Sequence, residues 1–132
     1  MNAPTLLVID DDESIRKALR RTLKQDGYTI HLASNGKEGL ELLAAQPIDL
    51  VLSDNLMPGM VGLEVLQLVR ERRPEVGRVL LTGNADAEVA QRAVDEKIIH
   101  RFVAKPWDDA ELKGVLKAVL AEMQGARAKP PA

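Results

Sequence analysis

The sequence predicts an α/β fold in which five parallel strands form a doubly wound sheet with helices on both faces. Strand-like and helix-like patterns alternate five times along the chain. Most of the strands are continuous apolar runs, which are typical of parallel sheets buried on both faces. Because crossovers between parallel strands are right-handed, the result is a three-layer (βα)5 arrangement. If its strand order is 2-1-3-4-5, strands one and three are neighbours at the point where the winding reverses.

The first strand and helix open this pattern. An apolar strand over Thr5–Asp10 precedes a helix whose apolar residues are spaced to share one face, namely Ile15, Leu19 and Leu23. Gly27 ends this helix, since glycine is common just beyond a helix C-terminus. A short second strand over Thr29–Ala33 follows.

The second helix begins at a predicted capping box. Asn35 can cap the helix while Glu38 reaches back toward it. Pro47 ends the helix before the buried third strand, which runs to Asp54. The segment Asn55–Gly62 contains proline and glycine and is therefore predicted as a loop.

The third and fourth helices differ in apolar content. The third helix stops at Pro74 and carries an apolar face made of Leu63, Leu66 and Val69. Strand four covers Arg78–Thr82, and a weakly apolar helix follows at about Ala87–Val94. We expect this fourth helix to be the least stable one, because it buries little apolar area. Strand five covers Arg101–Ala104.

The last helix has the clearest helical pattern. Its apolar residues are Leu112, Val115, Leu116, Val119, Leu120 and Met123. Asp108 and Glu111 form its capping box, and Trp107 can pack onto Leu112 as a hydrophobic staple. We expect one domain over residues 1–124 and a frayed tail over residues 125–132.

The composition excludes several classes of function. The 132 residues are 45% apolar and 29% charged with a net charge of -2, as in an ordinary globular domain. Basic residues are interleaved with acids, so we expect no nucleic-acid surface. No apolar run is long enough to span a membrane and no signal peptide is visible, so a cytoplasmic protein is expected. The absence of cysteine excludes disulfides and thiolate catalysis.

Polar residues suited to phosphoryl chemistry follow four of the strands: Asp10, Asp11, Asp54, Thr82 and Lys105. Carboxyl ends of parallel strands meet at one edge of the sheet, where ligands bind. In the expected strand order the three aspartates share one cleft, and a hard divalent cation, Mg²⁺ or Mn²⁺, would relieve their mutual repulsion. Lys105 adds a fixed cation and Thr82 a hydroxyl donor, which together would neutralise a phosphoryl group in transfer. Asp54 would be the nucleophile and would form an acyl phosphate.

These residues closely resemble the receiver domain of two-component response regulators, the CheY-like family with a flavodoxin-like fold. The resemblance covers about residues 5–123 and rests on five motifs in order: Val8-Ile9-Asp10-Asp11, Ser53-Asp54, Met57-Pro58-Gly59-Met60, Leu81-Thr82-Gly83 and Lys105-Pro106. It implies that Asp54 accepts a phosphoryl group from a sensor histidine kinase or a histidine phosphotransfer protein. Asp11 and Asp54 would bind Mg²⁺ directly with the backbone carbonyl of Leu56, and Asp10 would act largely through water.

The resemblance also assigns roles in switching. Lys105 would pair with the phosphoryl group, and Thr82 would swing toward it. Phe102 matches the switch aromatic that turns inward when Thr82 moves. Leu56 and Asn84 fall at the two positions that tune the lifetime of the phosphoryl group. The Lys105–Pro106 peptide is often cis in this family.

Two segments depart from the usual family pattern. Val61 stands in the stretch where an acid is common after the second loop methionine, outside the phosphoryl site. The usual Gly-Ala before strand five is replaced by Lys97-Ile98-Ile99-His100. That stretch resembles receivers that precede cyclic-dinucleotide phosphodiesterase domains.

The predicted function is a phosphorylation-controlled switch that catalyses only its own phosphoryl acceptance and loss. Activation would reshape the face made by helix four, strand five and helix five, and thereby control a downstream protein effector. We expect a monomer that can dimerise through this face when phosphorylated. The capping and first-turn roles of Asp12 and Glu13 keep both residues out of the predicted site.

Two other functions remain open on sequence alone. A small phosphatase of the haloacid dehalogenase type would use Asp10 as nucleophile, with Asp10-x-Asp12, Leu81-Thr82-Gly83, Lys105 and Asp108-Asp109 imitating its motifs. That alternative leaves Asp54 without a role. An inert receiver-like scaffold would bind partners without phosphorylation.

Overall fold

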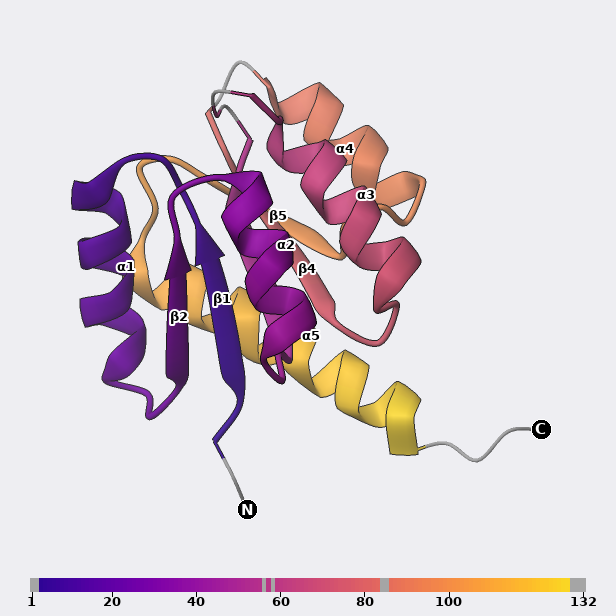
Figure 1. Ribbon diagram of the computed structural model, residues 1–132, viewed down its shortest axis with the longest axis horizontal. Coiled ribbons are helices and arrows are strands. Elements are labelled where there is room, and N and C mark those ends of the chain that lie inside the picture. Colours follow the sequence, from indigo (N-terminus) through magenta and orange to yellow (C-terminus); the bar gives the residue numbers. More distant parts are fainter. Residues whose placement is uncertain (1–2, 56, 58, 84–85, 129–132) are drawn as a thin grey trace.

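The computed structural model describes residues 3–55, 57, 59–83 and 86–128. Five strands and five helices alternate along them (Figure 1). The strands are β1 (Thr5–Ile9), β2 (Thr29–Ala33), β3 (Leu50–Asp54), β4 (Gly77–Thr82) and β5 (Arg101–Ala104). The helices are α1 (Glu13–Lys24), α2 (Gly36–Ala45), α3 (Gly62–Arg72), α4 (Ala87–Asp95) and α5 (Asp109–Ala128).

All five strands are parallel and lie in the order β2-β1-β3-β4-β5, as predicted. β1 pairs with both β2 and β3, so the chain reverses its winding direction at β1 and β3. β1 ends one residue earlier than predicted, but the Asp10 backbone N–H still donates to the Ala33 carbonyl across the sheet edge at 3.1 Å. The switch point between β1 and β3 therefore opens at the carboxyl edge, where the predicted site residues lie.

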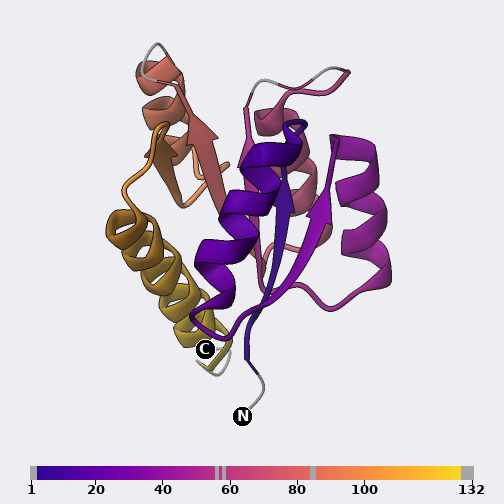
Figure 2. The same ribbon diagram turned by 90° about the vertical axis from the view of Figure 1, so that its left-hand side faces the viewer.

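Helices cover both faces of the sheet (Figure 1, Figure 2), and a hydrophobic core lies on each face. Side chains alternate across a strand, so each apolar run supplies both faces. One face packs against α1 and α5 through Leu6, Val8, Leu50, Leu52, Val79, Leu81 and Val103. The other packs against α2, α3 and α4 through Leu7, Ile9, Val51 and Leu80. Burial on both faces explains why the strands read as continuous apolar runs.

The helix starts follow the predicted caps with one difference. Asp12 caps α1 by accepting from the Ser14 backbone N–H at 2.8 Å, which confirms it as a capping residue. Asn35 caps α2 through the Glu38 backbone N–H at 2.8 Å, but the Glu38 carboxylate accepts from the Ser34 hydroxyl at 3.0 Å. In a capping box, the Glu38 carboxylate would accept from the Asn35 backbone N–H. Here it accepts from the Ser34 hydroxyl instead.

The end of α5 differs from the predicted boundary at residue 124. The helix continues through Gly125 to Ala128. Glycine costs only about 1 kcal/mol in a helix interior, and the flanking Gln, Ala and Arg residues favour helix, so Gly125 does not end it. The part of the predicted tail beyond Ala128 lies outside the described residues.

α4 buries only small side chains among its described residues, Ala90 and Ala93, while Val89 is 47% exposed. Its low stability stays a prediction, for which this thin contact is the structural basis. Within the described ranges, none of the helices has the length and apolar character that a membrane crossing requires.

Candidate functional site

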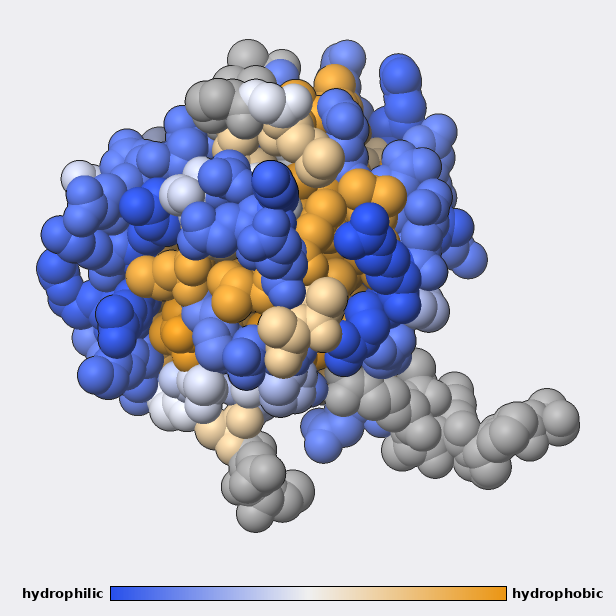
Figure 3. All heavy atoms as spheres, viewed as in Figure 1, coloured by the Kyte–Doolittle hydropathy of each residue, from blue (hydrophilic) through white to orange (hydrophobic). Residues whose placement is uncertain are grey.

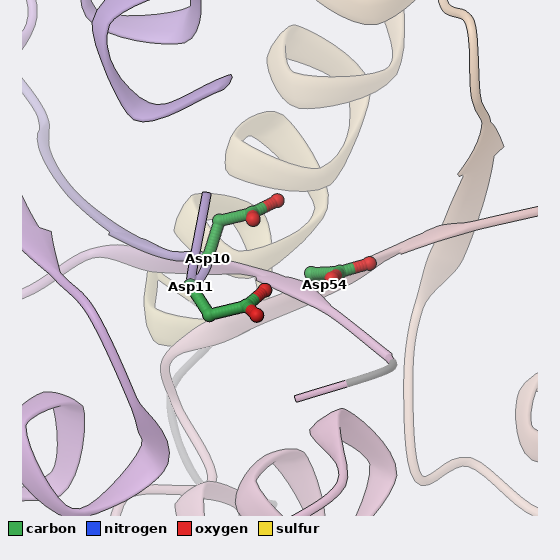
Figure 4. Close-up of side chains that lie close together, drawn as sticks. All are labelled: Asp10, Asp11 and Asp54. Atoms are coloured by element: carbon green, nitrogen blue, oxygen red, sulfur yellow. The ribbon is translucent and has the colours of Figure 1, made fainter. Parts of the chain in front are cut away.

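Sheet register brings the three predicted aspartates together. Ile9 pairs with Ser53 in the ladder between β1 and β3, so the residues that follow, Asp10 and Asp54, come level at the carboxyl edge. Ligand oxygens of Asp10, Asp11 and Asp54 all lie within 4.8 Å of one another. Figure 4 shows the three side chains side by side, two from the end of β1 and one from β3.

Lys105, which follows the edge strand β5, places a positive charge next to this cluster. β5 ends at Ala104, and the Lys105 backbone N–H donates to the Thr82 carbonyl at 2.9 Å. The ammonium Nζ lies 2.9 Å from Asp54 Oδ1 and 3.2 Å from Asp10 Oδ2. Burial lowers the pKa of Lys105, but the bond to Asp54 and the charges of both aspartates outweigh it and raise that pKa above its usual value. Lys105 is therefore a fixed positive charge, and the peptide to Pro106 is cis.

Asp10 is fully buried, in contrast to exposed Asp11. One Asp10 oxygen accepts from the Asp12 backbone N–H at 2.9 Å and the other from Lys105. Burial raises the pKa of Asp10, and the charge of Asp54 adds to this rise, against the lowering effect of its two donors. The ionised Asp10 carboxylate is therefore less favourable in the folded protein than in the unfolded chain.

We expect Asp10→Asn to raise the free energy of unfolding at pH 7 in the absence of divalent cations. The folded pKa of Asp10 lies above its unfolded value of 3.8. The folded protein therefore binds a proton at Asp10 more tightly than the unfolded chain does. As a result, the free energy of unfolding falls as the pH rises from the pKa of Asp10 in the unfolded chain through its pKa in the folded protein. Above that window the ionised carboxylate is destabilising, and asparagine removes its charge.

Urea unfolding in EDTA at pH 7 checks this result, with Asp12→Asn as the matched control. Asparagine caps helices as well as aspartate does, so the control should unfold at the same urea concentration as the wild type. If the Asp10→Asn protein unfolds at a lower urea concentration than the wild type, burial is not the dominant effect on the pKa of Asp10.

The site opens to solvent beside Asp11. A cavity of about 470 Å³ lies between the start of α2 and the loop before α3, and its wall includes Asp11, Asn35, Lys37 and Met60. The Asp54 side chain is 10% exposed next to the buried Asp10. The cavity thus reaches Asp11, a ligand oxygen of which lies within 4.8 Å of one on Asp54.

Thr82 ends β4 and Phe102 lies on β5, and their roles in switching stay a prediction. The buried Thr82 hydroxyl donates to the Gly83 carbonyl at 3.2 Å, so it is occupied in this conformation. Phe102 is partly buried against the core beneath α3 and α4. The remaining predicted residues, Leu56 and Asn84, lie outside the described residues.

Three residues near the site have structural features that the sequence did not indicate. Arg16 Nη1 donates to the Asp10 carbonyl at 2.6 Å and ties α1 to the end of β1. The Asn55 side-chain oxygen is buried without a hydrogen-bond partner among the described residues. Gly62 lies so close to β3 that a Cβ there would overlap the Asp54 carbonyl oxygen. In the sequence, Arg16 looks like an ordinary exposed helix residue. The glycine at the start of α3 is the one signal that could have indicated the close approach of Gly62 to β3.

Sequence comparison matches residues 6–117 to the response regulator receiver domain family. The hydrogenase transcriptional regulatory protein HoxA of Cupriavidus necator is 39% identical over 123 residues, which are 92% of this chain and 25% of that protein. The DNA-binding transcriptional regulator NtrC of Escherichia coli is 35% identical over 117 residues, 89% of this chain and 25% of that protein. The chain thus spans about a quarter of the length of these two relatives.

Solved structures agree with this assignment. The signal receiver domain of an HD domain-containing protein from Pseudomonas fluorescens has a TM-score of 0.90 at 34% identity, covering 98% of this chain and 96% of that one. The response regulator TrrA of Thermotoga maritima, solved in complex with Mg²⁺-BeF, has a TM-score of 0.78 at 32% identity, covering 88% of this chain and 98% of that one. The chain belongs to the family of response regulator receiver domains.

Proposed function

We propose that this receiver domain accepts a phosphoryl group on Asp54 and that this modification switches its contacts with other proteins. The observation that carries the proposal is the position of Lys105, whose ammonium group contacts Asp54 beside two further carboxylates. A phosphoryl group on Asp54 would lie next to the Lys105 ammonium group, which would balance part of its negative charge. Positioning and charge stabilisation are the main sources of catalysis in phosphoryl transfer.

The donor set fits a hard divalent cation. Three carboxylates offer oxygen ligands within 4.8 Å of one another, and exposed Asp11 leaves room for water and phosphate oxygens. Asp10, Asp11 and Asp54 would hold Mg²⁺ or Mn²⁺, with the Leu56 carbonyl as a further proposed ligand. When bound, the cation would neutralise negative charge on the phosphoryl oxygens. TrrA, a relative of the same fold, was solved with Mg²⁺ and a beryllium fluoride group.

Each remaining side chain has a defined task in this proposal. An Asp54 carboxylate oxygen attacks the phosphorus, the new O–P bond forms, and the bond from phosphorus to the donor breaks. Lys105 orients Asp54 before attack and pairs with the phosphoryl oxygens afterwards. Thr82 would rotate its hydroxyl from the Gly83 carbonyl toward the phosphoryl group. Water later hydrolyses the acyl phosphate, at a rate that Leu56 and Asn84 are proposed to tune.

Output would pass through the face formed by α4, β5 and α5. Phe102 lies partly buried on β5, and α4 buries little apolar surface, so this region can rearrange at low cost. The proposed phosphodonor is a sensor histidine kinase or a histidine phosphotransfer protein, and the proposed target is a downstream protein effector in the cytoplasm. The domain would make no direct contact with nucleic acid and would be a monomer that can dimerise when phosphorylated.

The test is the intact mass of the protein after incubation with acetyl phosphate. We expect the wild type to gain one phosphoryl group in Mg²⁺ and none in EDTA, and Asp54→Asn to gain none, because the amide is not nucleophilic enough to replace the carboxylate. Asp26→Asn, at an aspartate distant from the site on the loop after α1, is the control and should be phosphorylated like the wild type. An adduct of equal size on Asp54→Asn would contradict the proposal.

The family assignment favours this function over the phosphatase and scaffold alternatives. Geometry agrees with that choice, since the Asp10 carboxylate is buried and both of its oxygens already accept hydrogen bonds. Asp12, the second acid of the phosphatase motif, is used as the cap of α1.

A further inference from the structure

A second cavity lies at the edge of the sheet opposite the aspartates. It measures about 430 Å³ and lies where α3 and α4 end and where β4 and β5 begin. Five of its lining residues are basic, Arg70, Arg78, Lys97, His100 and Arg101, and no acidic side chain lines it within the described part of the chain. We call this cavity the basic pocket. In Figure 3 the outer, right-hand edge of the molecule, on the side of α3 and α4, is mainly hydrophilic, whereas hydrophobic side chains show further inward.

Arg78 is the unusual member of the basic pocket. It is only 5% exposed, and its four hydrogen bonds go to neutral backbone carbonyls, those of Pro74, Val76, Lys97 and Ile98. A guanidinium group has five N–H donors, so one donor on Nη2 remains available. Buried charges are normally paired with an opposite charge, and carbonyl dipoles neutralise this one only in part. Arg78 therefore supplies the basic pocket with a preorganised positive charge.

His100 supplies a neutral donor next to this charge. Its Nδ1 atom accepts from the Arg78 backbone N–H at 3.0 Å, so the neutral ring carries its proton on Nε2. Burial and the charge of Arg78 lower the pKa of His100, which favours the neutral ring. The ring is only half-buried, so its free N–H can reach a ligand in the pocket.

Arg70 and Lys97 form the rim. Arg70 donates to the Glu96 carbonyl at 3.2 Å, which uses a single N–H of its guanidinium group. The backbone of Lys97 is left-handed, with a φ of 64°, and this conformation sets the direction in which its Cβ points. Burial lowers the pKa of Arg78, and the nearby charge of Arg70 adds to this effect. Arg101 contributes less, because it is already paired with Glu122 at 2.6 Å.

We propose that the basic pocket binds a small phosphate-bearing anion. Arginine and lysine side chains recognise phosphate oxygens through charge-assisted hydrogen bonds, and arginine can do so with two parallel bonds. The volume exceeds that of one phosphate group, and Val94 and Ile99 add an apolar wall, so a phosphorylated small molecule fits better than inorganic phosphate. This site is separate from Asp54 and does not depend on phosphoryl acceptance there.

Titration calorimetry with pyrophosphate and with ADP, in buffer freed of divalent cations at low salt, tests the proposal. We expect saturable one-site binding with Kd below about 1 mM, tighter for ADP than for pyrophosphate. The double variant Arg70→Gln with Lys97→Asn should weaken it at least about tenfold, since it removes two cations from the rim. The exposed pair Lys17→Gln with Lys117→Gln removes the same charge elsewhere and is the control. Lys105→Met should leave binding unchanged, which separates the pocket from the phosphoryl site.

Several results would overturn the proposal. Absence of saturable binding by both probes would show that Arg78 only ties the loops before β4 and β5 together. Equal weakening in the two double variants would show nonspecific attraction to net charge. Citrate that binds as tightly as ADP would show a site for any polyanion rather than for phosphate, and loss of binding in Lys105→Met would place it at the aspartate cluster.

Discussion

Replacing Lys105 with methionine is expected to slow phosphoryl acceptance from acetyl phosphate by about 10²- to 10³-fold, the usual cost of removing one preorganised stabiliser of transition-state charge. Lys105 Nζ lies 2.9 Å from Asp54 Oδ1 and 3.2 Å from Asp10 Oδ2, so the change also leaves two carboxylates without their counter-charge. Methionine keeps most of the side-chain volume, which limits the change to charge. The measurement is the initial rate of mass gain at saturating Mg²⁺.

Lys113→Met is the matched control for Lys105→Met. The Lys113 side chain is 25% exposed against 24% for Lys105, and it also faces a carboxylate, that of Asp26 at 3.8 Å. The control should be phosphorylated at the wild-type rate, because it lies outside the site. A Lys105→Met protein that keeps its rate within about twofold would contradict the role of the ammonium group, since removal of a real stabiliser costs far more.

The change Gly62→Ala should lower the free energy of unfolding by about 3 kcal/mol, at the upper end of the usual cost of forced overpacking. A Cβ at this position would overlap the Asp54 carbonyl oxygen and approach the Asn55 Cα to 2.9 Å. Both obstacles are backbone, so no side-chain rotation relieves them. The Gly62 N–H also donates to the Asn55 carbonyl at 2.8 Å, and any shift of α3 would disturb that bond.

Gly114→Ala provides the opposite expectation in the same fold. A Cβ at Gly114 meets nothing within 4 Å, and the residue lies inside α5. Alanine there should stabilise the protein by about 0.5–1 kcal/mol, because glycine is the poorer helix former. Urea unfolding of both variants at pH 7 compares them. Equal stabilities of Gly62→Ala and the wild type would show that β3 and α3 separate without cost.

Much of this fold could be predicted because its apolar patterns are unambiguous. Continuous apolar strands predicted a sheet buried on both faces, and alternation with helices predicted that its strands are parallel. The strand order itself followed from the resemblance to receiver domains. The carboxyl-edge rule then brought Asp10, Asp54 and Lys105 together from positions far apart in the sequence. These predictions depend on periodicity and topology, which a single sequence carries well.

What could not be predicted depends on contacts between distant backbone segments. No local pattern shows that Arg16 reaches the Asp10 carbonyl, or that Arg78 bonds to four carbonyls of the loops before β4 and β5. α5 continues to Ala128, into the predicted frayed tail, because the residues around Gly125 favour helix. Glu38 bonds to Ser34 rather than closing the capping box, since that hydroxyl lies within reach.

The central claim, that Asp54 carries the phosphoryl group, is tested most directly by locating the modified residue. Borohydride reduces an acyl phosphate to an alcohol, so a phosphorylated aspartate becomes homoserine in the peptide that contains it. After incubation with acetyl phosphate and Mg²⁺, followed by reduction and digestion, peptide mass spectrometry should find homoserine at position 54. Homoserine at position 10 or 11 with Asp54 intact would contradict the account, because the nucleophile would then be one of the residues assigned to hold the cation.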